Sequence, residues 1–270
     1  MRRFFPVEEL ARDERFNRIT MRDRMADPRT AMIGRKDGSR PSSNRIVPSR
    51  PDASDAARAL MHGIFVGEIQ ALEGAGRTCF DFTTDEAPFA LKLDMARQCW
   101  DEARHVEISV KLADWMGSEI GQYAENTVLF EAACSADPVL RLAGVNRALE
   151  GLAIDVFTTM RDFAVEMNDP VLYFAEDCML ADEVTHVKMG STWLREVTKD
   201  DADRRTRALE FQKTVDGLFS FRGLRGEDEE SAIRLARRFR ELAGFDTAEI
   251  DDIAEQAAAQ RAERMAASAS

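Results

Sequence analysis

Two short stretches of the sequence carry the same pattern, Asp101-Glu102-Ala103-Arg104-His105-Val106 and Asp182-Glu183-Val184-Thr185-His186-Val187. Each is a Glu-x-x-His motif with an Asp before it and a Val after it. Residues three apart on an α-helix lie on one face, with Cβ atoms about 5–6 Å apart. A carboxylate and an imidazole from each stretch can therefore reach the same small region. The pattern predicts that both stretches are helical and that their Glu and His side chains act together.

The similarity between the two stretches extends upstream. Glu68-Ile69-Gln70-Ala71 matches Glu150-Gly151-Leu152-Ala153 as Glu-x-x-Ala. The spacing from this upstream Glu to the Glu of the Glu-x-x-His motif is 34 residues in the first copy and 33 in the second. We therefore interpret 68–117 and 150–198 as two copies of one helix–turn–helix unit.

Two antiparallel Glu-x-x-His helices, with one further Glu from each of the other two helices, bring four carboxylates and two imidazoles to one point. Without metal, four buried carboxylates would repel one another and take up protons. Two divalent cations neutralise them, and mixed oxygen and nitrogen ligation without thiolate favours iron or manganese over structural zinc. The predicted ligands of this dimetal site, which we also take as the catalytic residues, are Glu68, Glu102, His105, Glu150, Glu183 and His186.

Glu73 competes with Glu68 for the first ligand position. Residues 71–74 and 148–151 both read Ala-Leu-Glu-Gly, which would align Glu73 with Glu150. That alignment gives unequal spacings of 29 and 33 residues to the two motifs, so we assign the ligand to Glu68. Glu68 and Glu73 are five positions apart on a helix, so they face different directions, and we place Glu73 in a supporting position beside the site.

Composition and periodicity predict an all-α protein. Apolar residues make up 44% and charged residues 32% of 270, while Gly and Pro are few. We divide the chain into an irregular basic extension (1–52), a helical bundle with the dimetal site (53–200) and further helices packing on the bundle (201–270).

Asp-Pro pairs at 137–138 and 169–170 are typical helix starts, Pro88 is expected to open a helix in the same way, and Gly244 is a candidate C-cap. Helical spacing of apolar residues predicts helices at 54–82, 88–117, 138–168, 170–198, 203–222, 229–243 and 247–265, with a connector at 118–137.

Several classes of protein are disfavoured by the sequence. No apolar run is long enough for a membrane span, and the first residues lack the apolar core of a secretory signal. The four cysteines form no CxxC pair, so we expect free thiols and a cytoplasmic location. The net charge of −12 disfavours binding to nucleic acid, although the basic first 50 residues leave room for an RNA partner.

These motifs resemble the ferritin-like di-iron carboxylate superfamily, in which two helices each give one Glu and two others each give Glu-x-x-His. The stretch from His62 through Glu68 to Glu73, followed by Asp101 to His105, also resembles an uncharacterised bacterial ferritin-like family. The resemblance implies a four-helix bundle in which Glu102 and Glu183 bridge two metal ions. It pairs Glu68 with His105 at one ion and Glu150 with His186 at the other, and it implies that Asp101 and Asp182 accept the ring N–H of the histidine on the opposite helix.

The function implied is that of an O₂-dependent non-haem di-iron oxygenase or oxidase acting on a small organic molecule. Its cofactor would be two iron ions, with a mixed Mn/Fe or a manganese site as variants. No Gly-rich dinucleotide fingerprint follows a strand, so electrons would come from an external donor or from the substrate. We also expect a homodimer. Iron oxidation or storage and tRNA hydroxylation are the alternative functions.

Overall fold

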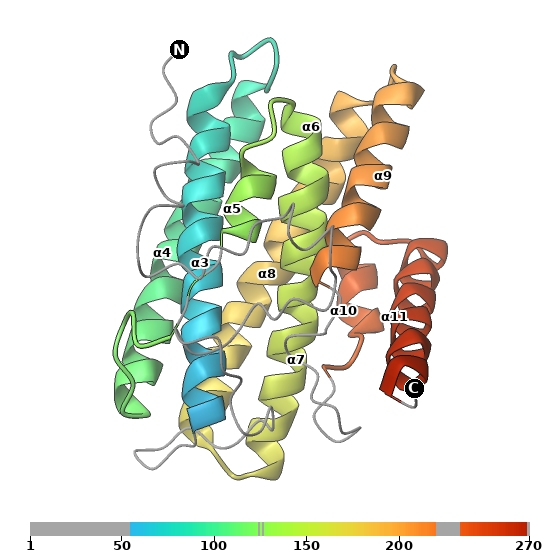
Figure 1. The fold of residues 1–270 in the computed structure, drawn as a ribbon. Coiled ribbons are helices and arrows are strands. Elements are labelled where there is room, and N and C mark those ends of the chain that lie inside the picture. The colour runs from blue at the N-terminus through green and yellow to red at the C-terminus, as the bar shows by residue number, and fades with distance from the viewer. Residues whose placement is uncertain (1–54, 124, 126, 220–232, 269–270) are drawn as a thin grey trace.

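The computed structural model describes residues 55–123, 125, 127–219 and 233–268, and over these ranges the chain is helical with no β-strand (Figure 1). The expected all-α class is confirmed, and the predicted extension 1–52 lies outside the described residues. None of the described helices is both long and apolar enough to cross a membrane. The elements are α3 (Asp55–Asp81), α4 (Phe89–Trp115), α5 (Val128–Ala133), α6 (Pro138–Arg141), η1 (Leu142–Leu149), α7 (Glu150–Glu166), α8 (Pro170–Val197), α9 (Ala202–Phe219), α10 (Arg237–Leu242) and α11 (Thr247–Ser268).

Local signals in the sequence explain where several helices begin and end. Asp137 and Asp169 are N-cap residues whose carboxylates accept hydrogen bonds from the backbone N–H groups of Val139 and Leu172. A proline follows each at the first helical position, where its missing N–H costs no hydrogen bond. Gly244 has φ +94°, a conformation that favours glycine, and it follows α10 as predicted.

The structure differs from the predicted helices in four places, one of which is the short helix α5 within the predicted connector 118–137. The single helix expected over 138–168 contains a π-helical segment, η1, which widens the turns just before Glu150. Pro88 is the N-cap residue of α4 and not its first helical residue. Residues 233–236, expected to be helical, are not helical in the structure, and α10 begins only at Arg237.

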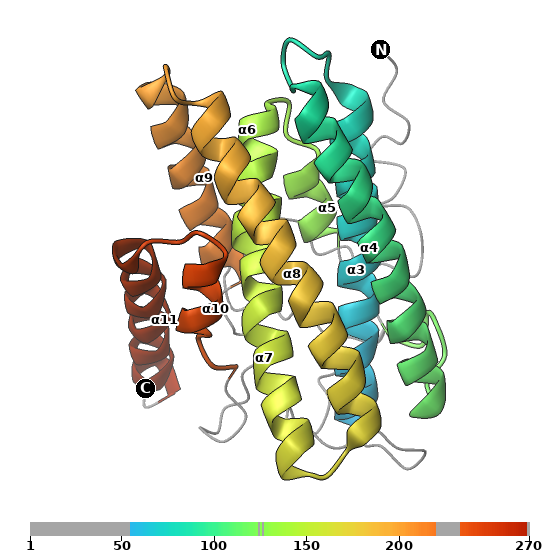
Figure 2. The same cartoon turned by 180° about the vertical axis from the view of Figure 1, so that it is seen from behind.

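The long helices α3, α4, α7 and α8 run side by side around the core (Figures 1 and 2). Helix α3 packs along α4, and α7 packs along α8, as expected for two helix–turn–helix units. Helix α4 also contacts α8, so the two units are joined through the helices that carry the Glu-x-x-His motifs. The largest apolar cluster lies between these helices and includes Met61, Leu112, Phe157, Leu172 and Met179.

Buried ion pairs attach the C-terminal helices to this core. Arg240 of α10 is 1% exposed and donates to Asp155 of α7, with Nη2 lying 2.6 Å from Oδ2. Arg147 of η1 donates to Ser191 of α8, Gln212 of α9 and Glu249 of α11. These contacts, made by residues just before and just after Glu150, pack the C-terminal helices against the segment that carries it.

Candidate metal centre

The six predicted ligands come from four helices and converge in the interior. As whole residues they are 0–6% exposed. Helix α3 contributes Glu68, and Glu150 is the first residue of α7, directly after η1. The other four belong to the two motif helices, with Glu102 and His105 on α4 and Glu183 and His186 on α8.

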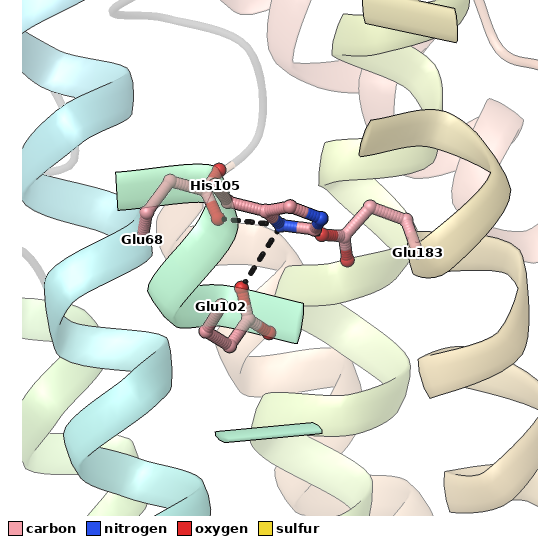
Figure 3. A group of neighbouring side chains, drawn as sticks. All are labelled: Glu68, Glu102, His105 and Glu183. Carbon is pink, nitrogen blue, oxygen red and sulfur yellow. Dashed lines mark hydrogen bonds and ion pairs between the residues drawn. The ribbon is translucent and has the colours of Figure 1, made fainter. Parts of the chain in front are cut away.

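A first group consists of Glu68, Glu102, His105 and Glu183, whose candidate ligand atoms all lie within 4.8 Å of one another (Figure 3). His105 is at its centre. Its Nδ1 atom lies 3.2 Å from Glu68 Oε2, 3.1 Å from Glu102 Oε2 and 3.1 Å from Glu183 Oε1. Three carboxylates from three helices therefore face one imidazole nitrogen.

A second group consists of Glu102, Glu150, Glu183 and His186, again within 4.8 Å. The Nδ1 atom of His186 lies 3.2 Å from Glu102 Oε1 and 3.5 Å from Glu183 Oε2. Glu102 and Glu183 thus present one oxygen to each histidine. The two groups share these two carboxylates, which is the arrangement that two bridging ligands require.

Asp101 and Asp182 lie behind the histidines, and the contacts expected for them are present. Asp182 Oδ2 is 3.2 Å from Nε2 of His105, and Asp101 Oδ2 is 3.3 Å from Nε2 of His186. Arg104 donates to both aspartates, at 2.5 Å and 2.8 Å. Such a carboxylate orients the ring and leaves the other ring nitrogen available for a metal.

The pKa values of the glutamates and histidines in these two groups are strongly shifted. Burial raises the pKa of Glu68 to about 8, and repulsion from Glu102 adds to this effect. Burial and repulsion from Glu183 also raise the pKa of Glu150. Although burial favours neutral forms, the surrounding carboxylates raise the pKa of both His105 and His186. Protons therefore balance the buried carboxylates in the metal-free protein, and cations could replace them.

The donor atoms fit divalent cations. Both carboxylate oxygens of Glu183 and Nδ1 of His186 lack a hydrogen-bond partner among the described residues, although all three are buried. The 3.2 Å contact between His186 and Glu102 does not have the geometry of a hydrogen bond. Because buried polar atoms are nearly always hydrogen-bonded, unsatisfied ligand atoms that face one another point to a bound cation.

Glu73 does not belong to this site. It is exposed on α3 and takes part in neither group. The step of five positions from Glu68 to Glu73 rotates the second side chain by about 140° around the helix. The supporting position that we predicted for Glu73 is therefore wrong. Glu68, by contrast, lies next to His105. His62 is also buried, but its Nε2 accepts a hydrogen bond from the backbone of Gly121, away from both groups.

Four polar residues close to the groups were not among the predicted site residues. Gln98 donates to Glu102 at 3.1 Å and to Glu150 at 2.8 Å, and Asn146 of η1 donates to Gln98 at 2.7 Å. Glu176 and Ser109 are 0% exposed and have no hydrogen-bond partner among the described residues. A search for polar residues four and seven positions from the shared glutamates would have found all but Asn146.

Comparisons with curated proteins and with solved structures found no match. A family model described as "Protein of unknown function (DUF455)" matches residues 2–251. The match covers most of the chain and includes both motif helices. The protein therefore belongs to the DUF455 family.

Proposed function

We propose that this protein is a ferritin-like dimetal carboxylate protein, and that it acts as an O₂-dependent non-haem di-iron oxidoreductase on a small organic substrate. The observation that carries the proposal is the pair of four-residue groups that share Glu102 and Glu183. Four helices supply these ligands with the distribution known from the ferritin-like bundle. No simpler structural role accounts for so many buried ionisable groups at one point.

The charge of the predicted ligands supports a site for two divalent metal ions. Four glutamates carry four negative charges when ionised, which two such ions neutralise. The ligand set of carboxylates and imidazoles, with no thiolate, favours iron or manganese. Glu68 with His105 would hold one ion, Glu150 with His186 would hold the other, and Glu102 with Glu183 would bridge them.

When bound, a pair of Fe(II) ions supplies the chemistry of O₂ reduction and substrate oxidation. The chain's own residues hold and orient the ligands. Asp101 and Asp182 orient the two imidazoles, and Gln98 positions Glu102 and Glu150 through its amide. Apolar side chains such as Phe157 and Met179, which are almost fully buried, keep bulk water away from the site.

The proposal is tested by preparing the protein with iron or manganese supplied, then measuring metal content and O₂ consumption. We expect close to two metal ions per chain, and O₂ consumption that stays slow until a substrate is added. Protein that carries no metal after reconstitution with either ion would contradict the dimetal proposal.

The same preparation separates the two classes of iron chemistry. An iron-storage protein would oxidise tens of Fe(II) per chain without an organic partner and would build a mineral. An oxygenase would stop after its own two ions. Sustained Fe(II) turnover would replace the oxygenase proposal by an iron-handling function.

A further inference from the structure

The two halves of the site differ at positions related by the internal repeat. Seven residues before the shared glutamates lie Met95 in the first copy and Glu176 in the second. Seven residues after them lie Ser109 and Gly190. All four are buried and lie on the helix faces that carry the ligands. Because α4 and α8 run antiparallel, Glu176 and Ser109 lie at one end of the site and Met95 and Gly190 lie at the other. Only the first end therefore has polar side chains at these positions.

The helix register brings Glu176 and Ser109 to the same level. Across α4 and α8, Asp94 contacts Trp193, Asp101 contacts His186 and His105 contacts Asp182. Each step forward along α4 is thus matched by an equal step backward along α8. Continued one turn beyond His105, this register sets Ser109 opposite position 178, two residues from Glu176.

Glu176 lies on the His105 side of the site. Burial raises its pKa well above the ordinary value, repulsion from Glu68 adds to the rise, and His105 opposes it. Met179 and Leu172, one turn on either side of Glu176 along α8, belong to the largest apolar cluster. A carboxyl group without a partner in such a place is costly.

In the opposite half, the polar residues beside the predicted ligands are paired within the described part of the chain. Gln98 and Asn146 form a hydrogen-bonded chain to Glu150. A Cβ atom added at Gly190 would lie 2.4 Å from Cβ of Asn146, so η1 and α8 are in close contact there. A ligand therefore has polar groups to bind beside His105 and little room beside Asn146.

We propose that Glu176 and Ser109 bind the primary ammonium group of a small amine substrate on the His105 side of the site. An ammonium group donates three hydrogen bonds, and the two side chains offer three unpartnered acceptors, Glu176 Oε1, Glu176 Oε2 and Ser109 Oγ. The four ligand glutamates are balanced by two metal ions. An ammonium ion bound beside Glu176 favours the ionised form of its carboxyl group, in which both oxygens accept hydrogen bonds, and the two charges then balance each other. This inference rests on the proposed function and deepens it by naming the substrate class.

The test uses the full chain loaded with Zn(II), which occupies the ligands without redox chemistry. Calorimetry compares n-butylamine, as its ammonium ion, with n-butanol and with butyrate, which have similar chains and different polar groups. We expect the ammonium ion to bind about tenfold or more tightly than the alcohol, as a charge-assisted hydrogen bond provides. Butyrate should bind least.

Substitutions test whether Glu176 and Ser109 cause the preference for the ammonium ion. Glu176→Gln and Glu176→Met should each remove it, and Ser109→Ala should weaken it by about fivefold, in keeping with one lost hydrogen bond. Glu176→Met also imposes the residue found at the corresponding position, Met95. Glu73→Gln is the matched control, since it makes the same change at an exposed position and should leave binding unaltered.

Metal content and thermal unfolding, measured on the same samples, separate the outcomes. Two Zn(II) per chain without a preference for the ammonium ion, or with no binding of any probe, overturns this inference and leaves the metal centre standing. Fewer than two Zn(II) in the unchanged protein overturns the metal centre and this inference with it. Glu176→Met should raise the unfolding temperature, because it removes an unpartnered carboxyl group, and a lower temperature would show a structural role and overturn the binding role.

Discussion

In the half of the site around His186, hydrogen bonds link the polar residues beside the predicted ligands. In the half around His105, two buried polar residues beside the predicted ligands have no hydrogen-bond partner among the described residues. In the first, Asn146, Gln98 and Glu150 form a continuous chain. In the second, Glu176 and Ser109 lie in an apolar interior. The ligands repeat almost perfectly while their surroundings do not, so similarity of ligands does not imply similar roles. In our proposal both halves hold a metal ion, and only the half around His105 has groups left for a further molecule.

The largest expected effect comes from removing one histidine at a time. His105→Ala and His186→Ala should both lower metal content from about two ions per chain. Because Gln98 and Asn146 brace the His186 half, it should retain its ion in His105→Ala, giving about one, whereas His186→Ala should retain less than that. Metal analysis after gel filtration measures both. Full occupancy in both variants would rule out the ligand assignment.

A second comparison concerns the two rival glutamates of α3. Glu68→Ala should lower metal content about as much as His105→Ala, because it removes a ligand of the same half. Glu73→Ala should leave metal content unchanged, because that side chain is exposed. The reverse order would mean that the Ala-Leu-Glu-Gly alignment identifies the ligand.

The aspartates behind the histidines should have an intermediate effect. Asp182→Asn and Asp101→Asn keep the shape of the side chain and remove the charge that orients His105 and His186. Each should weaken metal affinity by about 10–100-fold, as measured by competition with a chelator. Contacts with His186 and Arg104 lower the pKa of Asp101 to about 2 although burial opposes this, so it stays ionised at neutral pH. Unchanged affinity in both variants would reduce these residues to surface charges.

The smallest effect is expected for stability. Gln98→Leu removes the amide between Asn146 and Glu150 and leaves buried polar groups unpaired, which should cost about 1–3 kcal/mol. Met179→Leu, at the corresponding position of the other half, conserves volume and should cost less than about 1.5 kcal/mol. Denaturant unfolding of the metal-free variants compares them. Equal losses of unfolding free energy in the two variants would indicate that the two halves of the site are stabilised equally by their surroundings.

Most helix boundaries could be predicted because their causes are local. Asp137 and Asp169 cap the helices that follow them, and apolar spacing located α3, α4, α8, α9 and α11 to within a few residues. The prediction was wrong at 233–236, where helical spacing alone did not decide the conformation. It also missed α5 within the connector and the π-helical turns of η1, because a widened turn depends on what packs around it.

The sequence by itself determined which six residues come together. Glu-x-x-His spacing and the repeat of 33–34 residues are properties of a helix and of two similar units, so they can be counted along the chain. The tertiary structure decided what surrounds those residues, because that depends on the register between helices distant in sequence. It set Gln98 against Glu150 across 52 positions and joined Asp101 to Asp182 through Arg104. It also left Glu176 and Ser109 without a hydrogen-bond partner in the described part of the chain. Ligand identity is thus encoded by periodicity within a helix, whereas the difference between the two halves arises only when the helices pack.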